Sequence, residues 1–323
     1  MLMPPRRLGK SELLVSPVGL GCWQFSQGKG FNAYWTILAD RTIEDIVAAS
    51  LDGGVNWFDT AESYGSGTSE RALARTLQKA GRKPGEIIIA TKWMPVLRTA
   101  ENIPKTIDLR LDCLSPYGID LYQIHNPLYL SSTGNVMKAM AALAKEGKIR
   151  TIGVSNFGAK RMRKAHRTLA DLGIELVSNQ VHYSLVHRKI ETNGVLETAR
   201  ELGISIIAYS PLDQGILTGR FHDNPDLLKT LSGPRKYRGF YRRKSLERTR
   251  PVIDALKEIG ARHQAVPAQV ALNWIFNFHG ETVVVIPGAT KESQAAENAR
   301  SMSFALTKDE LDHLDRASKQ FLK

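Results

Sequence analysis

The sequence is short of the residues and runs that mark several classes of protein. Its 323 residues include only two cysteines, Cys22 and Cys113, which are too few for a disulfide framework and lack the spacing of a metal site. No apolar run approaches the roughly 18 residues of a membrane span, and the first residues lack the apolar stretch of a signal peptide. We therefore expect no metal, no membrane segment and a cytoplasmic location, where cysteines stay reduced.

Acidic residues are also scarce relative to basic ones. The chain has 44 Lys and Arg against 32 Asp and Glu, a net charge of +12, and much of the excess lies in residues 235–250, where Glu247 is the single acid. Such a charge favours an anionic partner: nucleic acid, an acidic membrane or a phosphorylated small molecule. A solvated loop explains the run equally well. The remaining composition, 42% hydrophobic and 24% charged, is that of a globular protein.

Short apolar segments alternate with longer amphipathic ones along the whole chain. The short segments predict eight strands buried on both faces, over 18–22, 55–60, 87–92, 121–125, 151–155, 176–181, 205–210 and 282–286. The longer segments predict helices over 42–52, 69–80, 102–114, 135–146, 159–172, 194–202, 246–261 and 267–277. This α/β alternation, without a break in composition, predicts one domain over residues 1–323 that folds as a closed (β/α)8 or TIM barrel. An open doubly wound sheet is the less favoured alternative.

Two segments lie outside the eightfold repeat. Residues 6–16 resemble two short strands around Gly9 and Lys10, which predicts a β-hairpin that plugs the floor of the barrel. Residues 218–245 form a polar, basic insertion after the seventh strand.

Four polar residues stand where predicted strands end. Asp59 ends the second strand, with Tyr64 five residues later, while Lys92 ends the third strand and His125 the fourth. In a barrel these ends share one face, which is the active-site face. Each residue alone could be a turn cap, a solvated lysine, a packed tyrosine or a core histidine. Their joint placement is what indicates a catalytic site.

The chemistry of these four side chains fits the reduction of a carbonyl group. A tyrosine titrates near pH 10, and a neighbouring lysine lowers that pKa and favours proton transfer. Asp59 could orient the ammonium of Lys92, and His125 could donate a hydrogen bond to a substrate oxygen. The set contains no pair of nucleophile and base. It predicts a proton donor for a carbonyl that becomes an alcohol.

Carbonyl reduction needs a hydride donor, and the usual dinucleotide fingerprint G-x-G-x-x-G is absent, as is the Walker A pattern. A cofactor would therefore be held by the barrel loops. The eighth strand ends in Ile-Pro-Gly-Ala-Thr, followed by a helix from Lys291, and barrels often bind phosphate at such a position. A simple turn at Gly288 is the alternative.

Five segments now point to a family. FDTAESYGSGTSE, IGVSNF, NQVHYS, AYSPLDQGILTG and IPGATKESQAAEN occur in this order, and with them the whole chain resembles the aldo-keto reductase superfamily. The resemblance implies that Tyr64 is the general acid, that Lys92 lowers its pKa and is bonded to Asp59, and that His125 orients the carbonyl. It also implies that an aldehyde or ketone is reduced by NADPH, which leaves as NADP+.

The resemblance further implies a set of residues around NADPH. Ser155, Asn156 and Gln180 would hold the nicotinamide carboxamide, and Tyr209 would stack on the ring. The pyrophosphate would meet Ser210, Pro211, Leu212 and Gly215, with Arg220 and either Arg235 or Arg238 as phosphate clamps. The adenosine end would meet Gly288, Thr290, Lys291, Gln294, Glu297 and Asn298. Cys22, Trp23 and Asp59 complete the expected cofactor residues.

The sequence departs from many members of the family at Gln294, where they have arginine. The 2′-phosphate contact is then expected from Lys291 or the insertion, and the chain looks more like the branch of bacterial enzymes and potassium-channel β-subunits. That branch supports a second hypothesis, an NADPH-binding, redox-sensing regulatory subunit with little turnover. His125 argues for the enzyme, because the channel subunits usually lack it.

Partners other than the substrate receive less support. A nucleic-acid binder rests on charge alone, so we expect neither nucleic acid nor a membrane, while a homo-oligomer is compatible with the sequence. The substrate pocket is expected between the loops 24–40 and 126–134, with four tryptophans that suggest an apolar or flat substrate: Trp23, Trp35, Trp57 and Trp93. Some of these could instead be packing residues.

Overall fold

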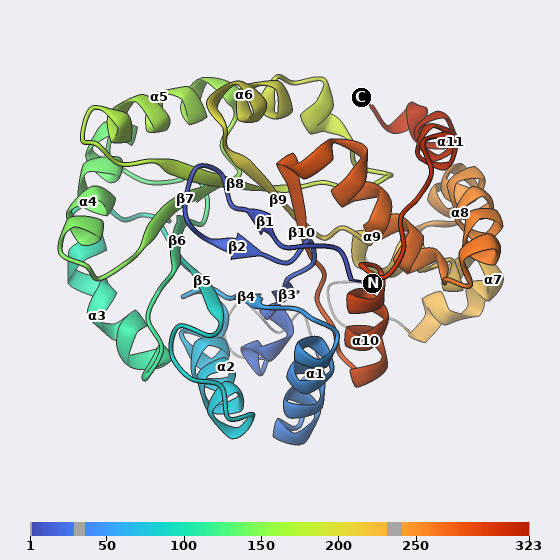
Figure 1. Ribbon diagram of the computed structural model, residues 1–323, viewed down its shortest axis with the longest axis horizontal. Helices are drawn as coiled ribbons and strands as arrows, with labels where there is room; N and C mark the ends of the chain where they lie inside the picture. Colours follow the sequence, from blue (N-terminus) through green and yellow to red (C-terminus); the bar gives the residue numbers. More distant parts are fainter. Residues whose placement is uncertain (1, 29–35, 231–240, 323) are drawn as a thin grey trace.

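Eight parallel strands form a barrel in the computed structural model, which describes residues 2–28, 36–230 and 241–322 (Figure 1). Each strand pairs with the next one in the chain. Parallel bridges from Val18 to Val285 and from Gly21 to Gly288 join the first strand to the last. The barrel prediction is confirmed, and the open sheet is excluded. The strands are β3 (Leu20–Gly21), β4 (Trp57–Asp59), β5 (Ile88–Trp93), β6 (Leu121–Ile124), β7 (Thr151–Ser155), β8 (Leu176–His182), β9 (Ser205–Tyr209) and β10 (Val283–Ile286).

Helices surround the barrel and cover the outer face of the sheet (Figure 1). In α1 (Asp40–Asp52) the buried residues follow helical spacing, so one stripe of the helix packs inward and the rest faces water: Ile43, Ile46, Val47 and Ser50. The other long helices are α2 (Thr68–Lys79), α3 (Asn102–Leu114), α4 (Thr133–Lys145), α5 (Ala159–Ala170), α6 (Val195–Leu202), α8 (Arg243–His263), α9 (Pro267–Phe278), α10 (Glu292–Arg300) and α11 (Lys308–Ser318). In the part of the chain described, no helix is long and apolar enough to cross a bilayer.

The N-terminal hairpin closes one end of the barrel, as predicted (Figure 1). Strands β1 (Arg6–Arg7) and β2 (Leu14–Val15) pair in antiparallel fashion. Leu8, Leu13 and Val15 pack with strand residues that point into the barrel, among them Trp57. Trp57 is fully buried and donates a hydrogen bond to the Ser16 carbonyl at 2.9 Å. It therefore belongs to the barrel floor and is not a wall of the substrate pocket.

The described residues of the basic insertion after β9 include helical turns and hydrophobic contacts. A 3-10 helix (Asp213–Thr218) leads into the short α7 (Arg220–Asp223), and Ile216, Phe221, Tyr241 and Leu246 form a small hydrophobic cluster. The second half of the basic run is the start of α8, which begins at Arg243. A helix there spreads the positive charges over its exposed face. Arg235 and Arg238 lie outside the described residues.

Candidate active site

The four residues predicted from strand ends meet at one side of the barrel mouth. The Lys92 ammonium is completely buried and donates to the Asp59 carboxylate, to the Thr60 carbonyl at 2.8 Å and to the Tyr64 hydroxyl at 3.4 Å. Burial acts to lower the pKa of Lys92, but Asp59 and Tyr64 together outweigh it and the pKa is raised. Lys92 is therefore a fixed positive charge beside the tyrosine hydroxyl.

His125 lies on the other side of Tyr64. The two rings meet edge to face with centroids 5.8 Å apart, and the Ser63 hydroxyl lies 3.2 Å from Nδ1. Burial and the charge of Lys92 lower the pKa of His125 to about 3, so the imidazole is neutral at physiological pH. When Ser63 donates to Nδ1, the ring proton stands on Nε2, which can donate to a substrate oxygen.

The pKa of Tyr64 moves in the opposite direction from the sequence-based expectation. Burial raises it, and the charge and hydrogen bond of Lys92 only limit the rise. The physical reason is desolvation, which penalises a phenolate more than one buried ammonium can offset. Tyr64 therefore keeps its proton at neutral pH, as a proton donor must. Trp23 stacks on it with centroids 6.2 Å apart, which makes one wall of the site.

Two glutamine side chains hold Asp59 from below. Gln123 and Gln180 donate to its Oδ2 atom at 3.0 and 2.9 Å. Gln180 was expected in the cofactor site, whereas Gln123 was missed. A signal was available, because Gln123 precedes His125 by two residues and successive side chains alternate along a strand.

The residues expected around the nicotinamide form one connected group. The Ser155 hydroxyl and the Asn156 backbone N–H both donate to the backbone carbonyl of Gln180, at 2.9 Å each. The Tyr209 hydroxyl donates to Asn156 Oδ1 at 3.0 Å, and the His182 ring stacks on the Tyr209 ring at 5.4 Å. An aromatic face and several amide groups thus stand beside the Asp59–Lys92 pair.

The segment expected at the pyrophosphate is a tight turn that follows Tyr209. Ser210, Asp213, Gln214 and Gly215 all have φ between +47° and +96°, which L side chains rarely adopt. Pro211 and Leu212 lie in the same turn. A side chain added at Gly215 would lie 3.7 Å from an Arg220 guanidinium nitrogen, so these two predicted residues are brought together. Such strain is typical of ligand-binding segments.

The comparisons with known proteins now decide the family. A sequence model described as the Aldo/keto reductase family matches residues 17–319. The chain belongs to the aldo/keto reductase family. As a member, it is an oxidoreductase.

Relatives of the aldo/keto reductase family match nearly the full chain. An uncharacterized oxidoreductase of Mycobacterium tuberculosis is 36% identical over 95% of this chain and 90% of its own length. The chloroplastic pyridoxal reductase of Arabidopsis thaliana is 30% identical over 99% of this chain and 88% of its own. A solved structure of glycerol dehydrogenase from Gluconobacter oxydans, 24% identical, has a TM-score of 0.83 over 99% of this chain and 96% of that chain. The last comparison shows that the fold is shared.

The predicted adenosine residues of this aldo/keto reductase surround the start of α10. The Thr290 backbone N–H and hydroxyl both donate to Gln294 Oε1, at 2.8 and 3.1 Å. Lys291 and Glu297 are exposed, whereas Asn298 is buried and donates to the Gly288 carbonyl at 3.5 Å. Gly288 packs against the Gln24 amide, where any added Cβ would come within 2.3 Å.

Three expectations about individual residues need correction or lie outside the structure. Cys22 is fully buried, with its Sγ directed at the Leu20 carbonyl and its backbone N–H donating to the Asp59 backbone carbonyl at 2.8 Å, so it presents no exposed surface to a ligand. Trp93 is also fully buried, and its indole donates to Asn102 at 3.0 Å in the layer between barrel and helices. It is not a pocket wall. Trp35 lies outside the described residues.

A cleft of about 330 Å³ opens beside the site rather than over Tyr64. His182, His187 and Asp213 line it together with residues of α8, and His182 is shared with the back of the Tyr209 ring. No residue of the predicted tetrad lines this cleft. Across residues 2–28, 36–230 and 241–322, no group of three or more His, Cys, Asp or Glu could hold a metal ion.

Proposed function

We propose that this aldo/keto reductase reduces an aldehyde or ketone to an alcohol with NADPH. The observation that carries the proposal is the buried Lys92 ammonium, which bonds Asp59 on one side and Tyr64 on the other, next to a neutral His125. This arrangement is a proton-donating site for a carbonyl oxygen. It contains a general acid, a fixed charge and a hydrogen-bond donor on one wall.

The residues present fit a nicotinamide cofactor. The Tyr209 ring offers an aromatic face next to the amides of Asn156 and Gln180. The strained turn after it and the exposed Lys291 suit the phosphates of such a molecule. When bound, NADPH would supply the hydride for the carbonyl carbon.

Each catalytic side chain then has one task. His125 donates from Nε2 to the substrate oxygen and fixes its angle. Tyr64 gives its hydroxyl proton to the same oxygen as charge develops there, and Lys92 stabilises the phenolate that is left. Asp59 keeps the ammonium in place, because Lys92 is completely buried and needs a compensating charge.

The phosphate residues favour NADPH over NADH in this proposal. Lys291 stands at the N-cap position of α10 and is exposed, and Arg220 lies beside Gly215. Both are cations suited to phosphate oxygens. We propose a small aldehyde or ketone as the substrate. The relatives support this class of carbonyl compounds but no single compound within it.

The test compares the Tyr64→Phe variant with the unchanged protein. Removal of the proton donor should lower kcat at least about 100-fold for any aldehyde that the protein reduces, while the Kd for NADPH changes by less than about twofold because the ring remains. The measurements are NADPH oxidation at 340 nm and quenching of tryptophan fluorescence.

Tyr117→Phe is the matched control, because its hydroxyl bonds the Arg82 carbonyl far from the tetrad. This variant should keep its turnover. Unchanged turnover in Tyr64→Phe would contradict the proposal. Tight NADPH binding without turnover of aliphatic, aromatic or sugar aldehydes in the unchanged protein would instead favour the regulatory-subunit hypothesis.

A further inference from the structure

Gln123 is a buried amide at the base of the site that no part of the reaction described above uses. It stands on β6 opposite Lys92 on β5 and Gly153 on β7. Gly153 leaves room for it, since an added Cβ there would lie 3.0 Å from Gln123 Cγ. Its side chain is completely buried, so its amide groups have only protein partners to satisfy.

The partners of Gln123 settle how both glutamine amides are turned. Asp59 Oδ2 can only accept, so the groups that face it at 3.0 and 2.9 Å must be the N–H₂ groups of Gln123 and Gln180. Gln180 Nε2 also lies 3.3 Å from Gln123 Oε1. Gln180 therefore donates one amide N–H to Asp59 and the other to Gln123.

Because both amide protons of Gln180 are used in these bonds, its Oε1 is the atom of the side chain that can accept a hydrogen bond from a ligand. If the amide turned over, Oε1 would face both Asp59 Oδ2 and Gln123 Oε1, which are acceptors in a buried site. Such a contact between unpaired acceptors is costly. Asp59 and Gln123 thus hold the Gln180 N–H₂ group from two sides and keep its Oε1 turned away from both of their oxygens.

We propose that Gln123 is a positioning residue that fixes Gln180 so that its Oε1 accepts a hydrogen bond from the carboxamide N–H₂ of the nicotinamide. The inference rests on the proposed function, because it needs a nicotinamide beside Tyr209. It adds one residue to that function, because Gln123 orients Gln180 without touching the cofactor itself.

The test compares the affinities of NADP+ and of its 3-acetylpyridine analogue, which lacks the amide protons. The unchanged protein should bind NADP+ about tenfold more tightly, the effect of one hydrogen bond of about 1.4 kcal/mol. Gln123→Met keeps the volume but removes both polar groups, so the ratio of the two Kd values should fall to about two or less. Quenching of tryptophan fluorescence measures both constants.

Gln123→Asn is a second variant, which keeps an amide but withdraws it by one methylene and should lower the ratio in the same way. Tyr122→Phe is the matched control, since Tyr122 is equally buried on the same strand and points to the opposite face. In this variant the ratio of the two Kd values should equal that of the unchanged protein. A merely structural role of Gln123 would weaken both ligands alike and leave the ratio intact.

Two results would overturn the positioning role: a ratio near one in the unchanged protein, or an undiminished ratio in a folded Gln123 variant. These are separable from failure of the proposed function, which is judged by NADPH oxidation with an aldehyde panel. If the unchanged protein reduces aldehydes but the ratio of the two Kd values is the same in the Gln123 variants, the proposed function is supported and the positioning role of Gln123 is refuted.

Discussion

At the scale of single residues, burial rather than charge decides the protonation of the site. The pKa of Tyr64 is raised because its hydroxyl is desolvated, although Lys92 lies 3.4 Å away. The pKa of His125 is lowered to about 3 for the same reason, with Lys92 adding to the effect. The acid is therefore protonated and the imidazole neutral over the same wide range of pH.

This combination predicts how carbonyl reduction depends on pH. Since His125 is neutral above its lowered pKa and Tyr64 is protonated below its raised pKa, kcat/KM should be flat from about pH 5 to 8. It should fall only in the alkaline range, as Tyr64 loses its proton. Initial rates with a saturating cofactor across this range provide the measurement. A transition in kcat/KM with a midpoint between about pH 6 and 7, lost in the His125→Gln variant, would contradict a neutral His125.

The sequence predicted the positions of some site residues but missed or misplaced others. Asp59, Lys92 and His125 were found because strand ends share one face of a barrel. Gln123 was missed because its importance lies in its bonds to Asp59 and Gln180, which come from other strands. Trp57 was misplaced because the sequence does not reveal how deep a residue lies in the barrel. Trp93 was misplaced because its side chain faces the helices, as alternation after the inward-facing Lys92 indicates.

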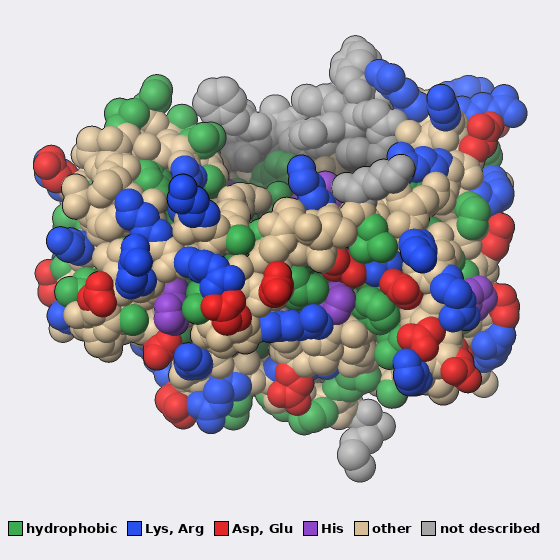
Figure 2. Space-filling view, turned by 90° about the horizontal axis from the view of Figure 1, so that it is seen from above, with side chains coloured by type: hydrophobic (Ala, Val, Ile, Leu, Met, Phe, Trp, Pro, Cys, Tyr) green, Lys and Arg blue, Asp and Glu red, His purple; other side chains and the backbone are tan. Residues whose placement is uncertain are grey.

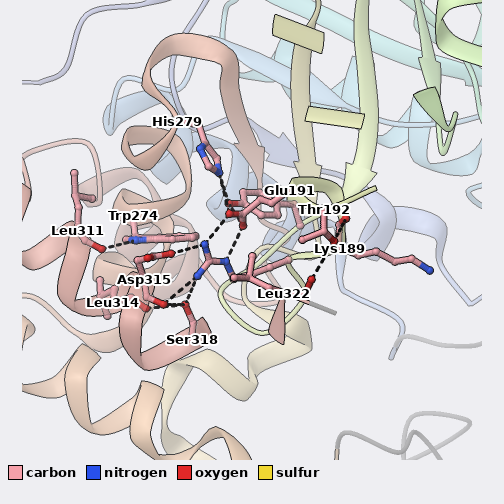
Figure 3. Close-up of polar contacts among 12 residues, drawn as sticks. Lys189, Glu191, Thr192, Trp274, His279, Leu311, Leu314, Asp315, Ser318 and Leu322 are labelled. Carbon is pink, nitrogen blue, oxygen red and sulfur yellow. Dashed lines mark hydrogen bonds and ion pairs between the residues drawn. The ribbon is translucent and has the colours of Figure 1, made fainter. Parts of the chain in front are cut away.

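At the scale of elements, one buried arginine connects α11 to the loop after β8, and Figure 3 labels its partners Glu191, Asp315 and Ser318. Arg188, in the loop after β8, is 1% exposed and donates to Glu191 at 2.7 Å, to Asp315 at 2.6 Å and to the Ser318 hydroxyl at 2.8 Å. Its guanidinium also lies 4.9 Å from the Trp274 ring. The helix that the sequence analysis did not predict is thus held by contacts across the chain.

The Arg188 cluster predicts a stability effect that depends on pH. Arg188→Met removes the arginine that pairs with the carboxylates of Glu191 and Asp315 and should lower the free energy of unfolding by about 3–5 kcal/mol at pH 7. Burial acts to raise the pKa of Glu191, but hydrogen bonds from Arg188 and His279 outweigh it and lower the pKa to about 2. The stability that this lowering contributes is present above the ordinary carboxyl pKa and is lost as pH falls towards 2.

The difference between Arg188→Met and the unchanged protein should therefore shrink as the pH falls below about 4.5. Urea unfolding at pH 7, 5 and 4 measures it. Arg163→Met is the control, because Arg163 pairs with Glu201 at the exposed surface, where such pairs contribute little. A difference that stays constant, or grows in acid, would show that Arg188 does not act through Glu191.

At the scale of the whole molecule, positive charge is spread over the surface. Figure 2 shows Lys and Arg side chains across the face that it presents, with acidic side chains among them. One contribution comes from α5, where Lys160, Arg163, Lys164 and Arg167 stand on a single helix. A basic surface favours anionic ligands in general, so the preference among cofactors must come from the residues at the site.

Lys291 is the residue at which that preference can be measured. At a hundredfold excess over its Kd, NADPH should stabilise the protein by about 2.7 kcal/mol, and the same concentration of NADH by less. Lys291→Met should reduce the gap between the two cofactors, because it removes a cation from the start of α10. Thermal unfolding with each cofactor is the measurement, and Lys308→Met on α11 is the control. An equal shift with NADPH and NADH in the unchanged protein would refute a 2′-phosphate contact.

The order of strands and helices was determined by the sequence alone, because hydrophobic periodicity is local and a parallel alternation leaves few topologies. Strand ends then placed Asp59, Lys92 and His125 on one face. Tertiary structure decided what depends on distant segments meeting: the desolvation of Tyr64 and His125, the depth of Trp57, and the pairing of Gln123 with Gln180. Burial and hydrogen bonding between strands are properties of the closed barrel, so no stretch of sequence contains them.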